Sequence, residues 1–152
     1  MHRKITLVRD LDIIEKELHN TSGGVLAFNV DGENAVQYTT TFLYLDKNIY
    51  FFLEKDDEIY EKIRFNDSVS FTILKDERSR KSRTRDEGYY IFSAAVLGLI
   101  KIVDEKKTID DIRNKYLSKY SLKKSGESKS SHSKELVMID SEEIQAIEEE
   151  GV

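Results

Sequence analysis

Residues 24–52 of this chain, GVLAFNVDGENAVQYTTTFLYLDKNIYFF, carry most of the information that decides its fold. Valine, threonine, tyrosine and phenylalanine recur through the stretch, and such β-branched and aromatic residues are typical of strands. Asp31-Gly32 lies between two of these runs and predicts a hairpin, because glycine tolerates the positive φ that a tight turn requires. We therefore expect strands at 25–30, 35–44 and 49–53.

The pattern of strands and short connections continues beyond this stretch. Residues 56–65 predict a short helix capped by Asp56 or Asp57. Residues 68–74 predict a fourth strand. Residues 89–103 predict a fifth strand that is too long to run straight, so we expect a bulge or bend at its glycine, Gly98.

Helices are expected on either side of this strand-rich region. Residues 10–19 are amphipathic and follow the capping residue Asp10. A second helix is expected at 109–120, opened by a capping arrangement of Thr108 with Asp111.

The C-terminal part is less regular. Residues 121–134 are polar, basic and of low complexity, which predicts a flexible loop. A last strand is expected at 136–139, and residues 141–147 either continue it or become helical. Several antiparallel strands with few helices predict a mainly β (α+β) barrel with helices packed outside it.

Composition limits the kinds of protein this chain can be. Hydrophobic residues make up 39% and charged residues 35% of the 152 residues, which predicts a single soluble domain over 1–152. There are no cysteines, so disulfides and thiolate chemistry are excluded, and the three histidines follow no metal-ligand spacing. The absence of a long apolar stretch and of a signal peptide predicts a cytoplasmic protein that does not enter a membrane.

Three segments of the chain together resemble a known family. They are residues 24–52, residues 58–73 (EIYEKIRFNDSVSFTI) and residues 96–116 (VLGLIKIVDEKKTIDDIRNKY). In this order and spacing they resemble the FMN-binding split-barrel family related to pyridoxamine 5'-phosphate oxidase, including its general-stress-protein-like members. The resemblance implies an antiparallel split β-barrel with peripheral helices and a homodimer with FMN at the subunit interface. It also implies an FMN-dependent oxidoreductase whose substrate, a small molecule, is unknown.

The resemblance also suggests which residues bind the cofactor. Strand 35–44 would pass the flavin ring and ribityl chain, and the next strand and its turn would flank the ring. The candidates are Gln37, Thr39, Thr40, Thr41, Phe52, Leu53 and Lys55. Threonine hydroxyls can bond the polar edge of the ring. The open alternatives are that the threonines only favour a strand, that Phe52 and Leu53 pack in the core, and that Lys55 is a solvated turn residue. The sequence shows no set of catalytic residues.

One group of positions departs from the family. The Ser-Arg-Lys group with which the family holds the flavin phosphate falls on Asp57, Glu58 and Ile59 in this chain. Carboxylates repel a phosphate dianion, so this exchange works against standard FMN binding. It motivates a second hypothesis: a non-enzymatic split-barrel protein that has lost standard FMN binding and acts as a ligand-binding or scaffolding dimer.

Residues 78–85, RSRKSRTR, form the densest cationic run in the sequence. Arginines there could contact a phosphate of the partner subunit's cofactor, or the run could be a solvated loop. A nucleic-acid interface is the weaker interpretation, because no aromatic residue lies within the run to stack on bases and the net charge of the chain is −5.

Overall fold

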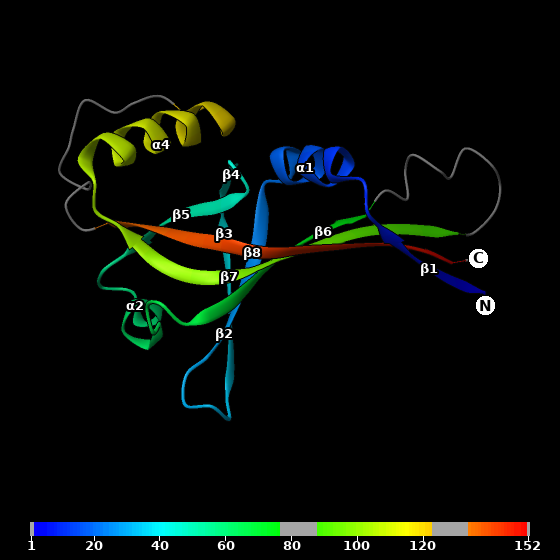
Figure 1. Ribbon diagram of the computed structural model, residues 1–152, viewed down its shortest axis with the longest axis horizontal. Helices are drawn as coiled ribbons and strands as arrows, with labels where there is room; N and C mark the ends of the chain where they lie inside the picture. The colour runs from blue at the N-terminus through cyan, green and yellow to red at the C-terminus, as the bar shows by residue number, and fades with distance from the viewer. Residues whose placement is uncertain (1, 77–87, 123–133, 152) are drawn as a thin grey trace.

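The computed structural model describes residues 2–76, 88–122 and 134–151, and it confirms an antiparallel sheet that curls into a half-barrel with three helices (Figure 1). The order of strands in the sheet is β3-β2-β6-β7-β8-β5-β4, and β1 pairs with β8 outside this path. The elements are β1 Arg3–Val8, α1 Leu11–Asn20, β2 Gly23–Asn29, β3 Ala35–Thr41, β4 Leu43–Leu45, β5 Asn48–Glu54, α2 Glu58–Lys62, β6 Ser68–Asp76, β7 Tyr89–Val103, α4 Lys106–Lys119 and β8 Lys134–Gly151.

The main core fills the inside of the curled sheet. Alternate residues of β2, β5, β6 and β7 point inward and are buried, and Leu26, Phe51 and Phe71 are among those with no exposed surface. Helix α1 adds Ile14 and Leu18 to this core. Burial of so much apolar surface, at about 25 cal/mol per Å², is the main force that holds the half-barrel together.

A second, smaller cluster lies on the outer side of the sheet beneath α4. Ile112 of the helix packs there against Leu43 of β4, Tyr50 of β5 and Leu136 of β8. Helices α1 and α4 lie on the same side of the molecule in Figure 1, and α2 lies on the other side. Helix α4 therefore covers the part of the outer face where β4, β5 and the start of β8 lie side by side.

The strand expected at 35–44 is in fact two strands, β3 and β4, at opposite edges of the sheet. Only Phe42 separates them along the chain, and it is completely buried. The curl of the sheet brings its two edges together here, so that the chain leaves one edge and enters the other within a single residue. An uninterrupted β-type sequence gives no local sign of such a crossing.

The last strand is longer than expected. β8 pairs with β5 in its first part, with β7 along its length and with β1 at its end, so residues 141–147 belong to a strand. Strand β1 was not expected from the sequence. It joins β7 and β8 in a ribbon that extends beyond the half-barrel and carries both chain ends (Figure 1).

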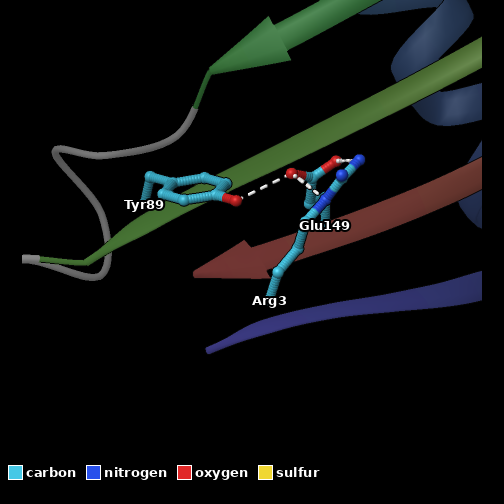
Figure 2. A network of polar contacts seen from close by, with 3 residues as sticks. All are labelled: Arg3, Tyr89 and Glu149. Atoms are coloured by element: carbon cyan, nitrogen blue, oxygen red, sulfur yellow. Dashed lines mark hydrogen bonds and ion pairs between the residues drawn. The ribbon is translucent and has the colours of Figure 1, made fainter. Parts of the chain in front are cut away.

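A polar network ties the three strands of this ribbon together near its tip (Figure 2). Arg3 Nε lies 2.8 Å from Glu149 Oε1, and the Tyr89 hydroxyl donates to the same oxygen at 2.7 Å. The Tyr89 hydrogen bond, together with Arg3, lowers the pKa of the Glu149 carboxyl. Because Arg3 is exposed and Glu149 and Tyr89 are only partly buried, solvent weakens these interactions, and the network fixes side-chain positions more than it stabilises the fold.

Several local predictions can be compared with the structure directly. The cap of α1 is confirmed, because Asp10 Oδ1 accepts from Asp12 N at 3.0 Å. The bulge at Gly98 is confirmed by a register shift between β7 and β8 at that position. The predicted opening of α4 is wrong: the helix begins at Lys106, and Thr108 donates to Glu105 Oε2 at 3.1 Å.

The structure does not describe most of the residues on which two further predictions fall. The basic run 78–85 and residues 123–133 of the predicted loop 121–134 lie outside the described residues. Within the described ranges, no helix has the length and apolar character that crossing a membrane requires.

Candidate functional site

The candidate residues of β3 divide between its two faces. Gln37, Thr39 and Thr41 are exposed on the outer face of the sheet. Thr40 lies on the opposite face, and its hydroxyl donates to the Thr41 carbonyl at 3.0 Å. Three of the four candidates on this strand therefore share one surface, and Thr40 does not.

The candidates of β5 and its turn are separated in a similar way. Leu53 is completely buried in the main core, as the packing alternative expects. Lys55 is exposed and forms an ion pair with Glu135 at 3.0 Å. Phe52 points outward and is half-buried against α4. Of these three candidates only Phe52 lies near the outward residues of β3.

Tyr116 of α4 connects Phe52 to β3. Its hydroxyl hydrogen-bonds to the Thr41 hydroxyl, and its ring meets the Phe52 ring edge-on at a centroid distance of 5.5 Å. The Arg113 guanidinium lies 5.6 Å from the centroid of the same Phe52 ring. Burial raises the pKa of Tyr116 to about 12, so the hydroxyl stays protonated and can donate. We call this group, Thr39, Thr41, Phe52, Arg113 and Tyr116, the β3–α4 site.

Side chains at the end of α4 bind the backbone of Phe42, where the chain passes from β3 to β4. The Phe42 amide donates to the Tyr120 hydroxyl at 2.9 Å, and the Lys119 ammonium donates to the Phe42 carbonyl at 2.9 Å. The single proton of the Tyr120 hydroxyl goes to the carbonyl of either Ser22, at 2.6 Å, or Phe42, at 2.8 Å. Side chains of α4 thus satisfy backbone groups that lose their strand partners where β3 gives way to β4.

Lys119 packs on aromatic rings at the end of α4. Its Nζ lies 3.8 Å from the centroid of the Phe42 ring and 5.4 Å from that of Tyr120. Burial lowers the pKa of the Lys119 ammonium to about 8, and no carboxylate in the described part of the chain is paired with it to raise that value. A cation over an aromatic face is stabilised by the ring electrons, but less completely than by a carboxylate or by water.

The start of α2 lies near β3 but is acidic. Asp57 Oδ1 caps the helix by accepting from Ile59 N at 3.0 Å, as expected for the capping residue. Its other oxygen accepts from the Tyr38 hydroxyl at 3.4 Å, and burial, with a further contribution from Asp57, raises the pKa of Tyr38. Asp57 is thus already occupied as a cap, and Glu58 beside it is exposed. An anion at this place would meet two carboxylates.

Sequence reasoning overlooked the side chains that α4 contributes to this region. Tyr116 follows Arg113 by three residues, and Lys119 and the C-cap residue Tyr120 follow Tyr116 by three and four. These spacings place the four side chains along one side of the helix. The spacing of the two tyrosines is visible in the sequence, but by itself it indicates only a face of the helix that packs against the rest of the protein. Among the residues that the structure describes, no group of acidic or histidine side chains is arranged to hold a metal ion.

Comparisons with known proteins bear on the fold. No family model matches the chain, and no curated protein matches its sequence. Among solved structures, a proposed 5-nitroimidazole antibiotic resistance protein from Bacteroides thetaiotaomicron superposes with a TM-score of 0.80 at 12% identity, over 99% of this chain and 90% of that one.

Two other solved structures extend the comparison. A FAD-binding protein from Mesorhizobium loti has a TM-score of 0.67 at 19% identity, over 95% of this chain and 97% of its own. A proposed pyridoxamine 5'-phosphate oxidase from Listeria innocua has a TM-score of 0.61 at 22% identity, over 88% and 94%. At such identities a structural likeness establishes the fold alone. The chain has the split β-barrel fold that flavin-binding and pyridoxamine 5'-phosphate oxidase-like proteins share.

Proposed function

We propose that this protein is a flavin-binding protein of oxidoreductase type, with FMN as its cofactor and the flavin ring on the outer face of β3. The observation that carries the proposal is the contact of Thr41, Tyr116 and Phe52 at one end of that face. Hydroxyls suit the polar edge of an isoalloxazine, and aromatic rings suit its faces. A bound flavin would supply the redox chemistry, and the protein would position the ring and exclude water from it.

The open part of the outer face supports a homodimer within this proposal. Gln37, Ala27, Ser70, Leu97 and Glu143 lie opposite one another on neighbouring strands. Small side chains in the middle of this row leave an open hollow of about 690 Å³. We propose that a second copy of the chain, in the cytoplasm, covers this row and that the flavin lies between the two subunits next to Gln37 and Thr39.

Flavin binding can be tested by titration with FMN followed by removal of the excess. We expect retained flavin absorbance in the parent protein and about tenfold weaker binding in Thr41→Val, which keeps the shape of the side chain but loses its hydroxyl. Thr6→Val is the matched control, because Thr6 is exposed on β1, which pairs with the end of β8 and lies away from β3 and α4 in Figure 1. A parent protein that retains no flavin would refute the proposal.

A second candidate function is favoured by one specific observation. Asp57, at the family's phosphate position, is used as a helix cap and brings a negative charge to that position. A barrel without flavin that serves as a ligand-binding or scaffolding dimer would explain this. It predicts a colourless protein that rejects FMN but remains dimeric in light-scattering measurements, and the same titration separates the two functions.

A further inference from the structure

We propose, on the basis of the proposed function, that Lys119 of α4 binds the anionic end of the ligand, a phosphate monoester. This places the phosphate next to Phe42, at the α4 side of the β3–α4 site. The family resemblance would put the phosphate at the start of α2, and this proposal places none there.

Lys119 has few hydrogen-bond partners for a partly buried ammonium. An ammonium has three hydrogen-bond donors, and in the described part of the chain Lys119 uses one of them, toward the Phe42 carbonyl. No carboxylate is paired with it there, although the side chain is partly buried. Partly buried charges are normally paired because the loss of hydration is otherwise uncompensated. A phosphate oxygen would supply the missing acceptor and the missing negative charge.

Lys119 lies at the α4 side of the β3–α4 site. Lys119 contacts Phe42, which directly follows Thr41 in the chain, and Tyr120 beside it contacts Tyr116 at a centroid distance of 5.0 Å. Lys119 thus contacts the residue next to Thr41 and a ring that packs on Tyr116, so we place the phosphate of a ligand on Thr41 and Tyr116 within reach of the ammonium. The Phe42 carbonyl and ring hold Nζ in place, so little side-chain freedom remains to be lost when an anion binds.

Charge is distributed unevenly around the β3–α4 site. Arg113 and Lys119 lie on α4, and Arg113 shares part of its charge with Asp110 at 3.3 Å. The other end of the site, near the Tyr38 hydroxyl, faces Asp57. The field along β3 therefore runs from positive at α4 to negative at α2, and a phosphate dianion is favoured at the α4 end.

Paired titrations with FMN and with riboflavin, which lacks the phosphate, test this assignment. In the parent we expect FMN to bind more tightly than riboflavin. In Lys119→Met this preference should fall by about tenfold or more while the affinity for riboflavin stays the same. Lys115→Met is the matched control: Lys115 lies on the same helix but is exposed and paired with Asp111 at 3.0 Å. An unchanged preference in Lys119→Met would overturn the proposal.

A second measurement uses the parent protein and needs no flavin. The rate of acetylation of each lysine by acetic anhydride is followed by mass spectrometry, with inorganic phosphate or with sodium chloride at equal ionic strength. We expect phosphate to slow acetylation of Lys119 about threefold or more and to leave Lys115 unchanged. Protection of Lys119 in a protein that rejects flavin would refute the proposed function and support the anion site. Flavin binding without protection of Lys119, and without an effect of Lys119→Met, would support the proposed function and refute the anion site.

Discussion

Gly98 offers a demanding test of the architecture, because the structure explains why a side chain cannot be placed there. It lies at the bulge between β7 and β8, the longest strand pair of the sheet. A Cβ at this position would be 2.1 Å from the Asp140 carbonyl oxygen, 2.7 Å from the Asp140 carbonyl carbon and 3.0 Å from Ser141 Cα. These are backbone atoms in a paired strand, so they cannot rotate away as a side chain can.

The cost of Gly98→Ala follows from this geometry. Extra methyl groups in well-packed regions cost about 1–3 kcal/mol. The contacts here are with backbone, so we expect about 3 kcal/mol. For a chain of this size each kcal/mol lowers the melting temperature by about 2–4 °C, so the variant should melt about 6–12 °C below the parent.

The assay is thermal unfolding followed by circular dichroism, with Gly23→Ala as the matched control. Gly23 is also a strand glycine, but the nearest atom to its Cβ position is the Thr40 carbonyl oxygen at 3.6 Å, an ordinary contact. The control should melt within about 2 °C of the parent. A Gly98→Ala variant that also melts within about 2 °C of the parent would show that the bulge does not need the space.

Three other predictions concern single side chains. Tyr120→Phe removes the hydroxyl that binds the Phe42 amide, so urea unfolding should show a loss of about 1–3 kcal/mol; an unchanged midpoint would contradict the role of this contact. Asp57→Ala removes the cap of α2 and should cost about 1 kcal/mol in the same assay, whereas Asp57→Asn should cost less. Burial lowers the pKa of Lys119 to about 8 in the folded protein, against its ordinary value of 10.5, so the unfolded chain binds more protons between these values. Stability should therefore rise over that window, by about 1 kcal/mol after allowance for solvent screening, and this rise should be absent in Lys119→Met.

Local sequence signals predicted the parts of the fold that depend on neighbouring residues. The caps by Asp10 and Asp57 follow from short polar side chains just before helices. The hairpin at Asp31-Gly32 likewise depends on nearby residues: Asp31 Oδ1 accepts from Asn34 N at 2.9 Å, and Gly32 has a φ of 82°. The bulge at Gly98 was predictable because a glycine in a long strand usually marks a close approach of backbones.

What the sequence did not reveal depends on contacts between distant residues. Strand β1 is stabilised by β8, at the far end of the chain, and its own six residues are nearly all exposed. The end of β3 is decided by how far the whole sheet curls. The partial burial of Lys119 and its contacts with Phe42 arise only when α4 packs over Phe42, which is remote in sequence. Four candidates, Gln37, Thr39, Thr41 and Phe52, lie on outward faces, whereas alternation along the strands turns Thr40 and Leu53 away.

The single residue between β3 and β4 has a consequence for the range of ligands that this barrel can accept. Strands β3 and β4 occupy opposite edges of the sheet and are joined through Phe42 alone. The length of the backbone therefore limits how far the two edges can separate next to Phe42. Substitutions in the core can change the shape of the neighbouring surface, but they cannot lengthen this link. Adaptation to a bulkier ligand would therefore require inserted residues next to Phe42. Relatives whose sheet edges are farther apart should differ from this chain in the number of residues at this point, rather than only in their side chains.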